Sequence, residues 1–164
     1  MVNYIQAGDF LLSCTVLTSG NNYYKIKHLF NLLNLGCVNQ STFFGIQANY
    51  ICPEIVNFWC ASQQKKILDE IRGRKLILLG DGQNDSPGHS AQYLNYNLID
   101  PESGYLVVYD VVDKRQTKLN SNAMEMFGYT RSIKFLEEDK QDIQKIVTDG
   151  HIGMKSYMVN FNFP

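Results

Sequence analysis

The stretch from Lys75 to His89, KLILLGDGQNDSPGH, constrains the fold more than any other part of the chain. It begins with a short apolar run, residues 75–79, that is typical of a buried strand. The run stops at Gly80-Asp81-Gly82, and the following composition predicts a loop. We therefore expect Asp81 to end the strand with its carboxylate open to a ligand, as hard divalent cations require. An ordinary tight turn also commonly contains an Asp-Gly pair.

Composition and charge limit the classes of partner that this chain can have. The 164 residues are enough for about one domain with a sizeable core. Charged residues make up 19%, against about 25% in a typical soluble domain. The net charge is −1, so no global basic field indicates a nucleic-acid partner, although a local basic patch is not excluded.

The cysteines and the hydrophobic runs indicate a soluble, intracellular protein with no membrane partner. Cys14, Cys37, Cys52 and Cys60 have no CxxC spacing and no paired histidines, so we expect reduced, mostly buried thiols and no zinc site. No apolar run reaches the length of a membrane span, and the N-terminus does not have the pattern of a signal peptide.

Residues 1–72 are predicted to form a helical region. Apolar residues recur at helical spacing between candidate caps and breakers. The expected helices span residues 10–18 after Asp9, residues 23–34 after Asn21-Asn22, and residues 40–71 with an interruption near Pro53.

The second and third expected helices have the outline of a helix-turn-helix. The third opens with Gln40, Ser41 and Thr42, and the N-terminal residues of the second helix of that motif contact DNA bases. An ordinary helical hairpin gives the same pattern, and no arginine or lysine clusters near residues 40–47. Both interpretations stay open. The basic residues around Arg72 and Arg74 are typical of a solvated helix face.

Residues 73–164 change to a pattern of strands. We expect a strand at 75–80, a hairpin over 93–112 with a turn at 100–104, an amphipathic helix over 121–138 and a strand at 143–148. Three antiparallel strands, a helix and a strand beside the first make up the ribonuclease H-like arrangement. The expected fold class is therefore α+β or α/β, with a helical N-terminal region before an incomplete β-β-β-α-β domain.

In that arrangement three acidic residues would converge. Asp81 and Asp149 would end two adjacent strands, and Glu125 would point at both from the facing helix. Three close carboxylates repel one another unless cations neutralise them. Two Mg²⁺ (or Mn²⁺) ions would meet that need and would activate a water while stabilising the leaving oxygen of a phosphodiester.

The motifs around these acids resemble a known group of proteins. Asn122–Met126 and Val147–Gly150 look like the corresponding motifs of ribonuclease H enzymes. The closer resemblance is to DDE-type transposase-derived proteins of animals, several of which carry a THAP zinc finger. Their Gly-Asp-Gly-x-x-Asp-Ser-Pro-Gly-His-Ser-Ala-x-Tyr block is matched by Gly80 to Tyr93. Shorter blocks match at Gly8–Leu12, Ser41–Phe44, Ser121–Glu125 and Thr148–His151, so that the resemblance covers roughly residues 8–158.

The resemblance implies a domain that cuts and joins DNA with Mg²⁺, and we expect a nuclear location. Carried over, Asp81 and Asp149 are the first two metal-binding acids and Glu125 is the third, with Asp85 as the alternative for the first. His89 and His151 are candidates for contacts to phosphate or to a metal-bound water. A histidine beside a glycine turn more often caps that turn.

The chain also departs from the pattern of these proteins. Gln83 stands where they usually have arginine, no acidic residue follows Asp149, and no zinc finger precedes residue 8. We therefore expect a C-terminally truncated copy that is inactive alone. An alternative is a domesticated DNA- or protein-binding module with vestigial acids; a third is a nuclease of RNA–DNA hybrids. A sheet without its last strand has an exposed edge, which favours self-association.

Overall fold

The computed structural model describes residues 5–87 and 90–148, and the chain divides into two compact units, Met1–Ser62 and Gln63–Pro164. The first unit is helical, and the second combines helices with a mixed β-sheet, which confirms the expected α+β composition. The division differs from the expected boundary at residue 72. Leu68 and Ile71 are buried in the core of the second unit, so the helix that carries them belongs there.

The helices of the first unit begin close to the expected positions. They are α1 (Ala7–Thr18), α2 (Tyr23–Leu32), α3 (Gln40–Ile46) and α4 (Cys52–Phe58), with a π-helical turn at Gln47–Ile51. Asn22 caps α2 as predicted, because its Oδ1 accepts a hydrogen bond of 2.8 Å from the backbone N–H of Tyr24. The prediction for Asp9 was wrong. The helix starts at Ala7, and Asp9 lies in its first turn, where a negative charge is favourable.

A small core holds α1, α2 and α3 together. Val16, Tyr23, Val38 and Phe43 are its buried members. The Tyr23 hydroxyl donates a hydrogen bond of 2.9 Å to the carbonyl oxygen of Val38 and so fixes the turn between α2 and α3. Its ring packs on Phe43 with the ring centroids 4.7 Å apart.

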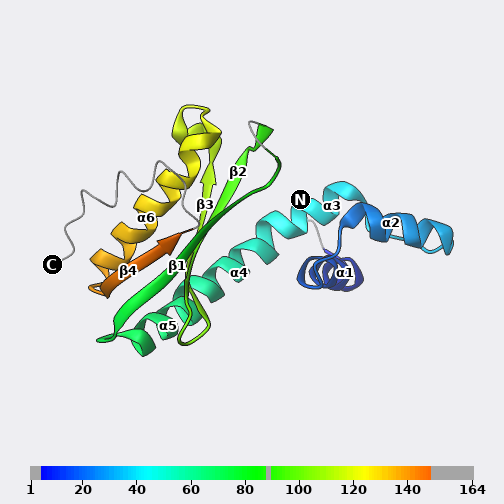
Figure 1. Cartoon of the computed structure of the whole chain (residues 1–164). Coiled ribbons are helices and arrows are strands. Elements are labelled where there is room, and N and C mark those ends of the chain that lie inside the picture. The colour runs from blue at the N-terminus through cyan, green and yellow to red at the C-terminus, as the bar shows by residue number, and fades with distance from the viewer. Residues whose placement is uncertain (1–4, 88–89, 149–164) are drawn as a thin grey trace. The chain divides into compact units, whose positions relative to one another are not determined.

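The second unit is built on a four-stranded sheet in the order β3-β2-β1-β4 (Figure 1). The unit contains α5 (Gln64–Ile71), β1 (Lys75–Asn84), β2 (Tyr93–Asp100), β3 (Tyr105–Asp113), α6 (Met124–Glu138) and β4 (Asp142–Thr148). β2 runs antiparallel to both β1 and β3, whereas β4 is parallel to β1. The chain crosses from β3 to β4 through α6, which packs on the sheet.

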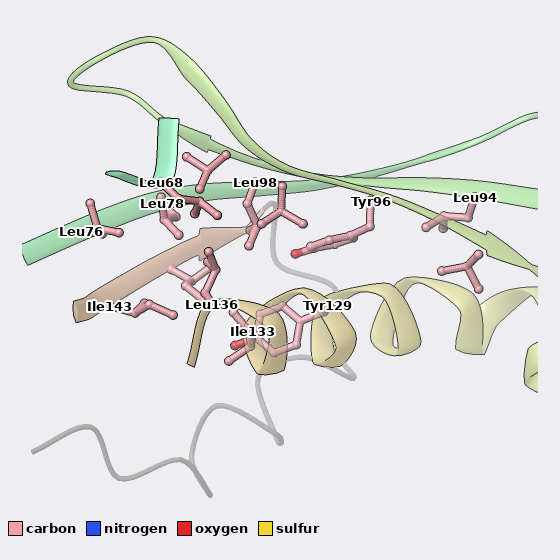
Figure 2. Close-up of a cluster of buried hydrophobic side chains, with 14 of the residues drawn as sticks. Leu68, Leu76, Leu78, Leu94, Tyr96, Leu98, Tyr129, Ile133, Leu136 and Ile143 are labelled. Carbon is pink, nitrogen blue, oxygen red and sulfur yellow. The ribbon is translucent and has the colours of Figure 1, made fainter. Parts of the chain in front are cut away.

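Strand alternation divides the side chains of the sheet between two faces. Leu76 and Leu78 of β1 are fully buried, as are Tyr96 and Leu98 of β2. Figure 2 shows the β2 side chains pointing toward α6, where the ring of Tyr96 meets that of Tyr129 edge-on with centroids 6.1 Å apart. The core therefore lies between the sheet and α6.

Strand β1 continues past the point where the sequence predicted its end. Gly80, Asp81 and Gly82 pair with Leu98, Asn97 and Tyr96, and the strand ends only at Asn84. The prediction that Asp81 ends the strand was therefore wrong. The glycines leave space for side chains that lie over the backbone, since a Cβ at Gly80 would collide with the Tyr96 hydroxyl. Glycine here serves close packing rather than a turn.

Two carboxylates that the sequence analysis did not single out fix the β2–β3 hairpin and α6. Asp100 is 2% exposed and accepts hydrogen bonds from the Ser103 hydroxyl at 2.6 Å and from the Arg74 guanidinium at 3.1 Å. Asp110 of β3 receives two hydrogen bonds from Arg131 of α6, one of them 2.7 Å long from Nε. The charged position within the apolar strand YLVVYDVV is the signal that could have identified Asp110.

Candidate functional site

Asp81 lies on the face of the sheet opposite α6. Its neighbours Gly80 and Gly82 face α6, so strand alternation directs the Asp81 side chain the other way. The side chain is exposed, and it lies across from Asn97 of β2. The carboxylate is thus open to a ligand, as expected, but from within a strand.

Glu125, in the first turn of α6, lies on the face opposite Asp81. A Cβ on Gly82 would come within 2.9 Å of Glu125 Cγ, so the side chain of Glu125 lies directly over this glycine. Asp81 is therefore next to the β1 residue that Glu125 covers, but the two carboxylates lie on opposite faces of the sheet. The structure does not direct them at a common ion.

Asp85 follows β1 and closes the loop to β2. Its Oδ1 accepts a hydrogen bond of 3.0 Å from the backbone N–H of Gln92, and its own N–H donates to the Tyr93 carbonyl oxygen at 3.0 Å. The residue lines a hollow of about 260 Å³, together with Gln83, Asn84, Tyr93 and Asn95. These contacts give Asp85 a role in fixing the loop.

The remaining predicted site residues of this unit, Asp149, His89 and His151, lie outside the described residues. Within residues 5–87 and 90–148, no three histidine, cysteine, aspartate or glutamate side chains are grouped closely enough to hold a metal ion. Since Asp81 and Glu125 lie on opposite faces of the sheet, the two described members of the predicted three-carboxylate site do not converge, and no reaction step through a metal follows from their arrangement.

The residues predicted to contact DNA form the first turn of α3, where their polar groups make local contacts. The Gln40 amide donates to the Tyr24 hydroxyl at 2.9 Å, and the Ser41 hydroxyl donates to Asn39 Oδ1 at 2.8 Å. The same Asn39 oxygen accepts from the backbone N–H of Thr42 at 2.8 Å and so caps the helix. The first turn of α3 is therefore locally satisfied, as in an ordinary helical hairpin.

The arginines that could contact phosphate are all paired with carboxylates. Ion pairs join Arg72 to Asp139 at 3.1 Å, Arg74 to Asp100 at 3.1 Å, and Arg115 and Arg131 to the aspartates nearest them. Arginine–phosphate contacts supply much of the affinity of DNA-binding proteins. For each arginine of the chain, a carboxylate already balances the charge that would attract a phosphate.

The helical unit has few charged residues and several exposed leucines. Residues 1–62 contain two lysines, one aspartate, one glutamate and no arginine. On α2 and the turn after it, four leucines are between 47% and 72% exposed, and we name them the leucine patch: Leu29, Leu32, Leu33 and Leu35. The first three share one side of the helix, because residues three and four apart are neighbours. The spacing of Ile26, Leu29, Phe30 and Leu33 in the sequence predicts the apolar stripe of a half-buried helix, whereas the structure leaves Leu29 and Leu33 exposed.

Comparison with protein-family models, with curated proteins and with solved structures finds no match to this chain. In the described part of the chain, none of the helices has both the length and the apolar character needed to span a bilayer. All four cysteines are free thiols.

Proposed function

We propose that this chain is a transposase-derived binding module, in which the helical unit binds protein and the acidic residues are vestigial. The leucine patch on a unit with only four charged residues carries this proposal. Exposed apolar patches mark protein-interaction sites, whereas DNA affinity depends on lysine and arginine contacts to phosphate. The ribonuclease H-like class of the second unit belongs to the same proposal. It is supported by the strand order β3-β2-β1-β4 with α6 between β3 and β4.

The partner that we propose first is a second copy of this chain. Two identical leucine patches can pack on each other about a two-fold axis, since each surface then meets its own copy. No acidic residue lies between Asp9 and Glu54, so the patch has no carboxylate that would have to be desolvated.

Sedimentation velocity over a range of protein concentrations tests this proposal. We expect the wild-type chain to form dimers and Leu32→Lys to remain monomeric, because Leu32 is 72% exposed and a lysine there would bury its charge in the interface. The matched control is Asn31→Lys, which adds the same charge at the next, also exposed, position of α2. A wild-type chain that stays monomeric, or dimers that survive Leu32→Lys, would contradict the proposal.

The salt dependence separates this association from binding to DNA. Apolar contacts persist when the salt concentration is raised, whereas phosphate contacts weaken steeply. We therefore expect the dimer to be retained at high salt, and duplex DNA to bind weakly at physiological salt.

Calorimetric titration with Mg²⁺ or Mn²⁺ tests whether the acids are vestigial. Because Asp81 and Glu125 face opposite sides of the sheet, we expect the heat of binding to be the same for the wild-type chain and for Asp81→Asn/Asp149→Asn. Glu125→Gln serves as the control for the acid on the other face. Binding that only the Asp81→Asn/Asp149→Asn variant abolishes would contradict this expectation and would favour a metal-dependent phosphodiester-transfer domain.

A further inference from the structure

A hollow of about 250 Å³ lies beside β3, between that strand, α5 and α6. We name it the edge hollow, and the residues that line it include Gln64, Val108, Tyr109, Arg131, Ser132 and Phe135. Val108 and Ser132 are 4% and 1% exposed, whereas Tyr109 is 45% exposed. The edge hollow therefore has a buried floor and opens to solvent on the side of Tyr109.

The backbone N–H and carbonyl groups of Tyr109 face the free edge of β3. The N–H of Asp113 donates to the Gln116 side chain at 2.9 Å, so Asp113 turns its backbone groups away from β2. The carbonyl oxygen of Val111 does the same, since it accepts from Arg131 at 2.7 Å. In an antiparallel ladder alternate residues face the same way, and no register shift interrupts this part of β3. Within the described residues no strand pairs with the edge that Tyr109 faces.

The positions on both sides of Tyr109 along this edge are already occupied. The Gln64 amide donates to the carbonyl oxygen of Val107 at 3.4 Å, and Arg131 holds that of Val111. A peptide that adds a strand to a sheet uses main-chain hydrogen bonds at several positions along the edge. Between these two occupied positions there is one donor and one acceptor, both on Tyr109. The edge hollow therefore suits a small molecule better than a strand.

The charges and polar groups of the edge hollow indicate an uncharged ligand. Arg131 forms an ion pair with Asp110, which also lines the hollow, so the two charges balance. The Oγ of Ser132 is buried and has no hydrogen-bond partner among the described residues. A buried hydroxyl without a partner costs free energy that a polar atom of a ligand recovers.

We propose that the edge hollow binds a small, uncharged cyclic amide, a flat ring with an N–H group next to a carbonyl. The ring N–H donates to the carbonyl oxygen of Tyr109, the ring carbonyl accepts from the Tyr109 N–H, and the ring packs on Val108 and Phe135. An apolar cavity of about 150 Å³ holds benzene, so this hollow has room for two fused rings. The inference is independent of the proposed dimer, because the leucine patch belongs to the other unit.

Titration of the isotope-labelled full chain with carbostyril, a benzo-fused cyclic amide, tests the proposal by two-dimensional NMR of the backbone amides. We expect the amide signal of Tyr109 to shift with a Kd of about 1 mM, as for a small fragment. The matched control ligand is the N-methyl derivative of carbostyril, which keeps the carbonyl but has no N–H. We expect it to bind roughly tenfold more weakly, because the acceptor of Tyr109 then has no donor.

Two substitutions of Tyr109 separate its backbone from its side chain. Tyr109→Pro removes the N–H, and a strand tolerates proline where that group faces a free edge. We expect carbostyril to bind this variant roughly tenfold more weakly than the wild type. Tyr109→Ala keeps the N–H and should bind like the wild type. Binding by both variants is followed through the amide signal of Ser132.

Three outcomes would overturn the inference. The first is a wild-type Tyr109 signal that does not shift at five times the expected Kd. The second is equal binding of carbostyril and its N-methyl derivative, and the third is a folded Tyr109→Pro variant that binds like the wild type. The dispersion of the amide signals reports whether Tyr109→Pro is folded. If it is not, the wild-type titrations with the two ligands decide alone.

Discussion

Replacing Gly128 with alanine is expected to destabilise the sheet unit by about 2 kcal/mol. Gly128 is buried on α6, and a Cβ there would lie 2.7 Å from Tyr96 Cβ and 3.2 Å from Val112. A Cβ atom moves only with its backbone, so the clash can be relieved only if α6 moves away from the sheet. That movement would also loosen the edge-on contact between Tyr96 and Tyr129. The gain in helix propensity, at most about 1 kcal/mol, does not offset the clash.

Urea unfolding followed by far-UV circular dichroism measures this effect. Gly45→Ala is the matched control, because Gly45 lies in α3 and a Cβ there would have nothing within 4 Å. We expect that substitution to be neutral or slightly stabilising. If Gly128→Ala were as stable as Gly45→Ala, the helix would not be packed as closely on β2 as the structure shows.

Replacing Asp100 with asparagine is expected to lower the free energy of unfolding by about 1–3 kcal/mol at neutral pH. The Asp100 carboxylate accepts from the Ser103 hydroxyl and from the backbone N–H groups of Glu102 and Ser103, and it pairs with Arg74. An amide keeps one oxygen acceptor but loses the charge that pairs with arginine. Glu102→Gln is the control, because Glu102 is 76% exposed and contacts the same Arg74.

The effect of Asp100→Asn depends on pH in a defined direction. Burial alone would raise the pKa of Asp100, but the hydrogen bonds from Ser103 and Glu102 and the charge of Arg74 together hold it below its usual value. A lowered pKa in the folded state stabilises the fold above the unfolded value of about 3.9. This contribution is lost as the pH falls through the folded value. We therefore expect the unfolding free energies of wild type and Asp100→Asn to converge below about pH 4.

A second acidic residue, Asp113, also makes the free energy of unfolding depend on pH. Hydrogen bonds from Arg115 lower the pKa of Asp113 to about 2. Both proteins retain Asp113, so its protonation lowers their stabilities equally and leaves the difference between them unchanged. If the difference stayed constant down to pH 2, the carboxylate of Asp100 would not be the source of the stabilisation.

The order and type of the elements could be predicted from the sequence. Local periodicity and turn chemistry placed strands at 75–80 and 143–148, a hairpin over 93–112 and a helix over 121–138, and each of them overlaps the corresponding elements of the structure. The placement of the fourth strand beside the first was also confirmed. These features depend on residues that are near one another in the chain, where apolar alternation and turn residues act directly.

The positions of the acids could not be predicted in the same way. A glycine-rich stretch such as Gly80-Asp81-Gly82 predicts a turn as long as its partners are unknown. In the structure, the Tyr96 hydroxyl lies over Gly80 and Glu125 lies over Gly82, so the glycines allow β1 to continue. Only this pairing decides that Asp81 and Glu125 face opposite sides of the sheet.

The sequence by itself thus determined which segments become strands and helices, and that acidic residues accompany β1 and α6. The tertiary structure alone decided which face of the sheet each acid occupies and which apolar residues remain exposed. The physical reason is that a strand turns successive side chains to opposite faces. Gly82 therefore faces Glu125, whereas Asp81, one position earlier, faces the other side of the sheet. Which face is covered depends on α6, a segment distant in the chain.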